Sequence, residues 1–148
     1  MAAGDYPLTP AEVRTYIHDF ADQNHLIDGE EFSDEGILLA MRMAAGDYNL
    51  IPPLSNIPPA QFPNITLLMY GTLGHLYLGK AANLARNTMS YSDGGLQVPV
   101  EERAELYLTL GNQYLAQFRD AGAKLKVHMN MEAGWGSVKS DNAMLPVW

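Results

Sequence analysis

The stretch from Asn64 to Ser90 constrains the fold of this chain most strongly. It follows Pro63, contains no proline, and is apolar on almost every side over its first two-thirds. Asn64 has a short side-chain acceptor that can cap a helix, and Pro63 disfavours an earlier start. At 1.5 Å per residue this helix would be roughly 40 Å long. Because a helix that is apolar all round is normally covered on several sides, the stretch predicts a long central helix.

Small residues recur inside this stretch at intervals of three to five positions: Gly71, Gly74, Gly79 and Ala82. Each glycine costs about 1 kcal/mol of helix propensity relative to alanine. Close packing against another backbone is the physical reason to keep glycines there. The spacing therefore predicts a groove along the helix in which a second helix lies.

A membrane span is the alternative interpretation, since the run from Ile65 to Leu84 has about the required length. Thr66, Thr72, His75 and Lys80 interrupt that run, and neither end carries a basic cluster. We therefore expect a helix buried in protein and no contact with a membrane.

Three further helices are predicted from local start signals. Thr-Pro-Ala-Glu at 9–12 has a capping residue, a proline at the first helical position and a capping-box glutamate, which predicts a helix to about Ala21. Ser33, followed by two acidic residues, predicts a second helix that ends at Asn49. Pro99 leads into a fourth helix, which we expect to pack antiparallel to the long one. Four helices with short connections indicate a mainly α fold, a small helical bundle.

The segment from Leu50 to Pro63 is rich in proline. Repeated prolines make a chain stiff and extended, unable to join a helix or the interior of a sheet. One interpretation is a proline-rich ligand for a small adaptor domain. The leucines and isoleucines between the prolines favour a strap that packs on the core of its own chain.

The last part of the chain changes its periodicity. Apolar residues alternate with polar ones from Leu125 to Glu132, which is typical of a strand with one apolar face. Such a strand would pair with a second strand near residues 96–98, or with another subunit. Trp135 and Trp148 follow, and both would be exposed unless they dock. We therefore predict a helical bundle domain over residues 1–124 and an extended C-terminal strand and arm over residues 125–148.

The net charge of −8 and a pI near 4.7 argue against a surface that grips nucleic acid, which requires clustered lysine and arginine. An acidic wall would still suit a conduit along which DNA passes without sticking. The chain has no cysteine, so disulfides and thiolate metal sites are excluded. Residues 1–6 have neither a basic region nor an apolar run, so we expect no secretory signal and synthesis in the cytoplasm.

The sequence offers little catalytic chemistry. His18 with Asp19 and Asp22 would make a weak metal site if His25 folded over it, although solvated polar groups at a helix end are the favoured interpretation. His75 lies among apolar residues and is predicted to be a hydrogen-bonded core histidine. The acidic pairs lie at helix starts, and the Asp-Gly-Gly at 93–95 lacks the residues that would complete a phosphate loop. We expect no enzyme, and no catalytic, cofactor-binding or metal-binding residues.

Five short segments together carry a resemblance to a known family. They are Tyr-x-x-Asp-Phe at 16–20, Leu-Ile-Asp-Gly-x-Glu-Phe-Ser-Asp-Glu at 26–35, Asp-Tyr-Asn-x-Ile-Pro-Pro at 47–53, Tyr-Gly-Thr-Leu-x-His-Leu at 70–76 and Asn-x-x-x-Tyr-Ser-Asp-Gly-Gly-Leu at 87–96. In this order they resemble small neck proteins of tailed bacteriophages, of the helical head-to-tail connector (adaptor) family. The likeness covers about residues 14 to 132. None of the motifs is a catalytic signature, so the resemblance depends on their order and combination.

The resemblance implies a structural virion protein at the neck, between head and tail. Its subunits would form a ring, commonly a dodecamer, which docks under the portal protein and extends the DNA channel toward a stopper or tail-terminator protein below. DNA would pass through without sequence-specific binding. A ring of head-to-tail contacts closes only if each contact has the right rotation.

The resemblance also implies roles for two sets of residues. A C-terminal arm would reach the portal or a neighbouring subunit through Leu125, Val127, Met129, Met131, Trp135 and Trp148. The turn of Tyr91, Ser92, Asp93, Gly94 and Gly95 would shape a contact between subunits. An ordinary turn between antiparallel helices explains that motif equally well, because glycines supply positive backbone angles.

Three alternatives to a connector stay open. A tail-completion or stopper protein of the same neck is one, although such proteins more often read as mainly β. A non-viral cytoplasmic helical binding module, with the proline strap as its ligand, is the second. The third is a small metal-dependent enzyme that uses His18 and His25.

Overall fold

A computed structural model of the protein describes residues 7–25, 29–87 and 100–135. Its elements in chain order are α1 (Pro10–Ile17), α2 (Asp34–Leu50), the short 3-10 helix η1 (Pro59–Gln61), α3 (Ile65–Arg86) and α4 (Val100–Trp135). Every regular element within these ranges is helical. The prediction of a mainly α helical bundle is therefore confirmed.

The capping signals read from the sequence set the helix starts. Thr9 Oγ1 accepts a hydrogen bond from the Glu12 backbone N–H at 3.3 Å, and a Glu12 carboxylate oxygen accepts one from the Thr9 N–H at 2.7 Å. Asn64 Oδ1 accepts from the N–H of the third residue of α3 at 2.9 Å. Helix α1 ends at Ile17, earlier than the expected Ala21, because His18 takes a left-handed conformation (φ 57°) and caps it.

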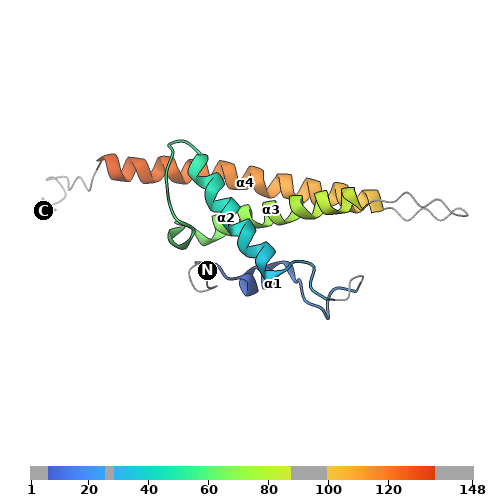
Figure 1. Ribbon diagram of the computed structural model, residues 1–148. Helices are drawn as coiled ribbons and strands as arrows, with labels where there is room; N and C mark the ends of the chain where they lie inside the picture. Colours follow the sequence, from blue (N-terminus) through green and yellow to red (C-terminus); the bar gives the residue numbers. More distant parts are fainter. Residues whose placement is uncertain (1–6, 26–28, 88–99, 136–148) are drawn as a thin grey trace, which may run out of the picture.

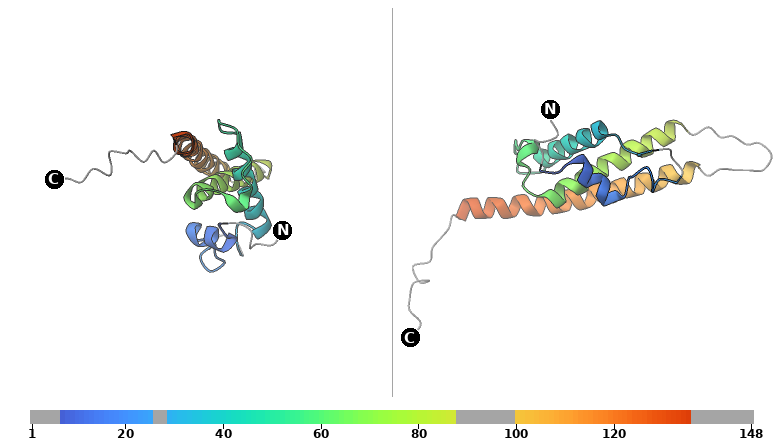
Figure 2. Two further views of the ribbon diagram at one scale, coloured as in Figure 1. Left: turned by 90° about the vertical axis from the view of Figure 1, so that its left-hand side faces the viewer. Right: turned by 90° about the horizontal axis from the view of Figure 1, so that it is seen from below.

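Helices α3 and α4 lie side by side and antiparallel, as predicted (Figures 1 and 2). Helix α2 crosses α3, and α1 lies near the beginning of α2 (Figure 1). Helix α4 has 36 residues against 22 for α3. Its C-terminal turns consequently extend past the rest of the bundle, as both figures show.

Two glycines of α3 permit the close packing of α4. A Cβ atom at Gly71 would lie 2.8 Å from the ring of Phe118, and one at Gly74 would lie 2.6 Å from the Leu115 side chain. The predicted groove of small residues is confirmed at these two positions. At Gly79 a Cβ atom would meet nothing within 4 Å, so this glycine does not serve the α3–α4 contact.

The core lies where α2, α3 and α4 meet. Its largest fully buried side chains are Tyr48, Phe118, Leu8, Ile37, Met41, Leu68, Leu73, Val13 and Thr72. These residues come from each of the four α-helices and from the segment before α1. The chain therefore buries one continuous core.

The proline-rich segment is a strap on the core of its own chain. The Asn49 side chain holds its middle: Nδ2 donates to the Ile57 carbonyl at 2.9 Å, and Oδ1 accepts from the Ile57 N–H at 2.9 Å and from Ser55 Oγ at 2.8 Å. Phe62 at its end is only 6% exposed and packs against Tyr48 with ring centroids 5.0 Å apart. The segment is thus a packed part of the fold.

The predicted strand from Leu125 to Glu132 is wrong. Helix α4 continues through this segment to Trp135, and it crosses the expected domain boundary at 124/125 without a break. The helical face that begins with Phe118 is extended by Gly122 and Lys126, which are both buried. The 3.6-residue period of this packed face overrides the two-residue alternation of apolar side chains.

Candidate interaction surfaces

The last turns of α4 form the first candidate surface, and we call residues 127–134 the α4 end. Every side chain in this range is exposed, whereas Lys126 just before it is 4% exposed. Val127 and Met131 are each 55% exposed and lie four residues apart, on one face of the helix. The α4 end therefore presents exposed apolar side chains, of which Met129 also contacts α2.

The base of the α4 end is fixed to the strap. Lys126 Nζ donates to the carbonyl oxygens of Ile51 at 2.5 Å and Pro53 at 2.9 Å, and it lies 4.7 Å from the centre of the Tyr48 ring. Burial lowers the pKa of Lys126 from its ordinary value. The Tyr48 hydroxyl lies 3.9 Å from the Met129 sulfur. These contacts give the α4 end a defined direction.

A groove between α2 and α3 is the second candidate surface, with a volume of about 580 Å³. We call it the α2–α3 groove. Leu39 and Met43 on its α2 side are 52% and 49% exposed. It is lined by Glu31, Phe32, Ser33, Gly36, Leu39, Ala40, Met43, His75, Leu76, Gly79, Lys80 and Asn83. The groove thus combines apolar side chains, most of them on its α2 side, with polar groups from α3 and from the segment that precedes α2.

Polar contacts fix one end of the groove. Lys80 Nζ lies 3.1 Å from a Glu31 carboxylate oxygen, and the Tyr107 hydroxyl lies 2.8 and 2.9 Å from the two oxygens of that carboxylate. Burial, together with the hydrogen bond to Glu31, raises the pKa of Tyr107 to about 12. This end of the groove is therefore tied to α4 as well as to α3.

The hydrogen bond predicted for His75 is not formed at Nε2. That atom is buried and lies 3.3 Å from Asp47 Oδ2, but it makes no hydrogen bond. His75 is thus partly buried and lines the α2–α3 groove, and its polar partner is the carboxylate of Asp47 at ion-pair distance.

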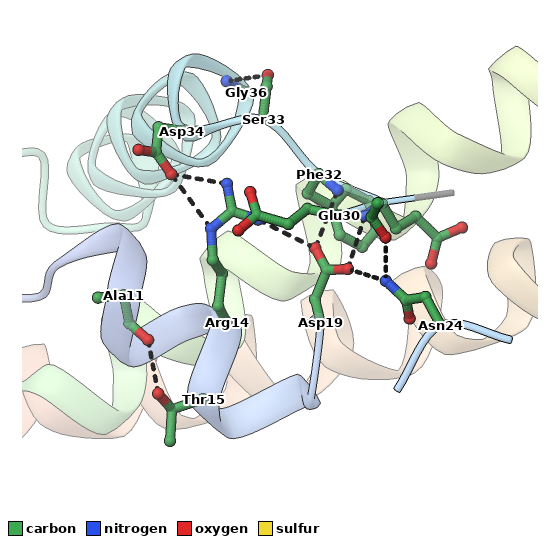
Figure 3. Close-up of polar contacts among 12 residues, drawn as sticks. Ala11, Arg14, Thr15, Asp19, Asn24, Glu30, Phe32, Ser33, Asp34 and Gly36 are labelled. Atoms are coloured by element: carbon green, nitrogen blue, oxygen red, sulfur yellow. Dashed lines mark hydrogen bonds and ion pairs between the residues drawn. The ribbon is translucent and has the colours of Figure 1, made fainter. Parts of the chain in front are cut away.

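A buried arginine network holds α1 against the start of α2 (Figure 3). Arg14 is 6% exposed, and its guanidinium lies 3.2 Å from Asp19, 3.0 Å from Glu30 and 2.7 Å from Asp34. Three carboxylates around one guanidinium satisfy its fixed fork of donors. The network joins parts of the chain that no short motif connects.

Asp19 is the centre of this network. Its carboxylate accepts hydrogen bonds from the backbone N–H groups of Glu31 at 2.6 Å and Phe32 at 3.0 Å, and from Asn24 Nδ2 at 2.7 Å (Figure 3). Burial alone would raise the Asp19 pKa, but these hydrogen bonds and the charge of Arg14 together lower it below its ordinary value of 3.8. Asp19 therefore acts as a structural anchor for residues 29–34.

The weak metal site considered from the sequence is not assembled. His18 and His25 are exposed, and Asp19 is committed to the arginine network. No group of three histidine or acidic residues in the described ranges is placed to hold a metal ion. Within the same ranges, no helix is both long and apolar enough to cross a membrane.

Tyrosines form a row between α3 and α4. Ring centroids are 5.9 Å apart for Tyr70 and Tyr114, 5.8 Å for Tyr114 and Tyr77, and 5.8 Å for Tyr77 and Tyr107. Burial is the main cause that raises the pKa of Tyr77 to about 12. The row contributes to the α3–α4 contact, and its four rings are partly buried.

The structure separates the residues predicted to form an interaction arm. Leu125 packs partly buried on the core, whereas Val127, Met129 and Met131 belong to the exposed α4 end. Trp135 is the last residue of α4. Trp148 and the whole turn of Tyr91, Ser92, Asp93, Gly94 and Gly95 lie outside the described residues.

Two features were missed by sequence reasoning. The α2–α3 groove combines residues more than thirty positions apart, so no local pattern indicates it. Arg14 was missed because a single arginine inside an amphipathic helix reads as solvent-exposed. The available signal was the clustering of acidic residues at 30–35 with Asp19, in a chain with few basic residues.

Comparisons with known proteins identify no relative. No protein-family model matches the chain, and no curated protein or solved structure matches it either.

Proposed function

We propose that this protein is a structural subunit of a tailed-bacteriophage virion, a head-to-tail connector that forms a ring under the portal and extends the DNA channel toward the tail. The observation that carries the proposal is the α4 end. The last turns of α4 extend past the bundle (Figure 1), and Val127 and Met131 on them are each 55% exposed. Exposed apolar side chains on a projecting element are typical of a protein–protein contact.

The order of the five sequence segments favours a connector among the possible assemblies. The stopper alternative would more often be mainly β, whereas the described part of this chain is built from helices. The binding-module alternative needs the proline strap as a free ligand. Asn49, Phe62 and Lys126 hold that strap on the core, which disfavours this alternative.

The charge of the chain is compatible with a DNA conduit. A net charge of −8 per subunit would be multiplied in a ring, and like charge repels a phosphate backbone. DNA would then pass through the channel without sequence-specific binding.

In this proposal the segment from Val127 to Trp148 is the arm that contacts the portal and neighbouring subunits, because Leu125 and Lys126 pack on the bundle. A truncation after Lys124 would also remove buried Lys126 and so disturb the strap. Ending the chain after Lys126 keeps this lysine and removes the α4 end with everything beyond it. The matched control lacks residues 2–6 at the other terminus.

The test is co-sedimentation with particles of the portal protein from the same phage. We expect the full chain and the control to sediment with the particles, and the chain that ends at Lys126 to stay in the supernatant. Circular dichroism checks that the truncated chain is still helical. Undiminished portal binding by a folded truncated chain would show that the arm is not the anchor.

A further inference from the structure

We infer that Met129 is a site of reversible oxidation by a peroxide, and that its sulfoxide fastens the last turns of α4 to α2 through the hydroxyl of Tyr48. The inference goes beyond the proposed function and does not depend on it, because the contact lies within one chain.

The Tyr48 hydroxyl is a strong donor that has a weak acceptor. Tyr48 of α2 is fully buried, and its hydroxyl lies 3.9 Å from the Met129 sulfur. Within the described ranges, this sulfur is the one hydrogen-bond partner of the hydroxyl. A thioether sulfur accepts hydrogen bonds only weakly, and a buried donor without a good partner costs free energy. The hydroxyl would therefore gain from a better acceptor at the position of the sulfur.

Met129 is also open to solvent, so an oxidant can reach it. It is 39% exposed, whereas Met41 and Met69 in the core are 0% and 9% exposed. Met43 and Met131 are exposed as well, but in the described part of the chain neither sulfur takes part in a hydrogen bond. Among the described methionines, Met129 thus combines access for an oxidant with a hydroxyl donor beside its sulfur.

The reaction is an oxygen transfer to sulfur. The chain has no cysteine, so methionine is its only source of oxidisable sulfur. A lone pair of the Met129 sulfur attacks one oxygen of hydrogen peroxide, an S–O bond forms, and the O–O bond breaks. The leaving hydroxide takes the proton from the transferred oxygen and departs as water. The sulfur is oxidised by two electrons to a sulfoxide, and the peroxide is reduced.

The added oxygen changes the contact with Tyr48. It is a polar acceptor, and on the side of Tyr48 it would lie one bond length nearer to the hydroxyl than the sulfur does. Starting from a sulfur at 3.9 Å, this brings the two oxygens into the range of an O–H···O hydrogen bond, about 2.5–3.0 Å. The sulfoxide is chiral, so one of its two epimers directs its oxygen toward Tyr48.

A stronger bond at Met129 would hold a part of α4 that is otherwise exposed. Lys126 is the last buried residue of the helix in the described ranges, and every side chain of the α4 end is exposed. Exposed helix ends open locally at little cost in free energy. A hydrogen bond at position 129 would fasten α4 to α2 about one turn beyond Lys126.

The sign of the effect distinguishes this contact from ordinary oxidative damage. A sulfoxide inside a core disrupts apolar packing and loosens the structure. At Met129 much of the side chain stays in water, so that cost is small, and the bond to Tyr48 decides the outcome. Oxidation should therefore make the α4 end more stable rather than less.

Hydrogen exchange after peroxide treatment tests the inference. The test variant is Met131→Leu, which keeps a similar apolar volume and leaves Met129 as the only methionine of α4. Peptide mass spectrometry confirms the sulfoxide at Met129. We expect exchange in residues 127–134 to slow by roughly two- to tenfold, the factor that one net hydrogen bond contributes. Methionine sulfoxide reductases should restore the original rate.

Two controls combine Met131→Leu with either Met129→Leu or Tyr48→Phe. The first removes the sulfur and the second removes only the hydroxyl, so peroxide should slow exchange in neither. Unchanged or faster exchange in the test variant, or equal slowing in the controls, overturns the inference. A Met129 that stays reduced while exposed Met43 is oxidised overturns it as well. If Tyr48→Phe does not fold, the Met129→Leu control decides the question by itself.

Discussion

Gly74 of α3 lies directly against Leu115 of α4, so that a Cβ atom added at Gly74 would be 2.6 Å from the Leu115 side chain and 3.2 Å from its backbone nitrogen. The Leu115 backbone cannot move away from an added Cβ atom as easily as the tip of a flexible side chain could. The glycine is therefore required by the approach of the two longest helices.

We expect Gly74→Ala to destabilise the protein by about 1–2 kcal/mol. Overpacking a tight contact costs about 1–3 kcal/mol, and the better helix propensity of alanine returns part of it. Urea denaturation followed by circular dichroism measures the change. Gly79→Ala is the control, since that position faces open space and should gain up to about 1 kcal/mol. Equal effects at both positions would contradict the packing role of Gly74.

Asp19→Asn should destabilise the fold by about 3 kcal/mol at pH 7, because it leaves the buried Arg14 without one of its charge partners. Asp120→Asn, which removes an exposed ion pair with Lys124 on α4, should cost no more than about 0.5 kcal/mol. Denaturation of both variants beside the natural protein gives the two values.

The effect of Asp19 should depend on pH. The pKa of Asp19 is lowered in the folded protein, so its stabilisation is present above the ordinary pKa of 3.8 and is lost as the pH falls through the lower folded value. The stability difference between the natural protein and Asp19→Asn should therefore shrink below about pH 4. A difference that stays constant from pH 7 to pH 3 would argue against an ionised anchor.

Lys126→Met should loosen the strap and cost about 1–3 kcal/mol, because two strap carbonyls lose their donor. Hydrogen exchange should become faster in the segment from Ile51 to Phe62. Lys124→Met changes an exposed lysine two residues earlier and should leave exchange there unchanged. Faster exchange in both variants would mean that the effect is not specific to the Lys126 contacts.

The buried phenols of the tyrosine row should ionise at a higher pH than an ordinary tyrosine. Burial raises the pKa of Tyr77 and Tyr107 to about 12, so both phenols should ionise well above the ordinary value of 10. Because the folded pKa is raised, the stabilisation that accompanies it is complete below pH 10 and is lost as the pH rises toward 12. Ultraviolet absorbance of the natural protein and of Tyr107→Phe as a function of pH measures the ionisation of the phenols directly. In urea all phenols should titrate together near 10, and the same result without urea would contradict burial of the row.

Much of the fold was predictable because helix starts are local. Thr9, Ser33 and Asn64 each cap a helix with a side-chain oxygen, and each is followed within a few residues by its bonding partner. Such a signal needs no knowledge of the rest of the chain. The close helix contact was predictable in part, since Gly71 and Gly74 pack against α4 while Gly79 faces the groove.

The course of the chain after Leu125 was not predictable in the same way. Alternating apolar residues fit a strand, and the same residues fit a helix if Lys126 is buried and Val127 is exposed. The burial of Lys126 depends on the strap carbonyls, which come from residues more than seventy positions away. The α2–α3 groove was likewise not predictable, because it depends on how two helices that are far apart in the sequence are placed in space.

The most direct test of the connector proposal is the mass of the purified protein by light scattering, alone and mixed with portal particles. The proposal predicts a closed multimer, or a monomer that binds the portal in many copies. A monomer that stays monomeric in the presence of the portal would contradict it and would favour a small helical binding module instead.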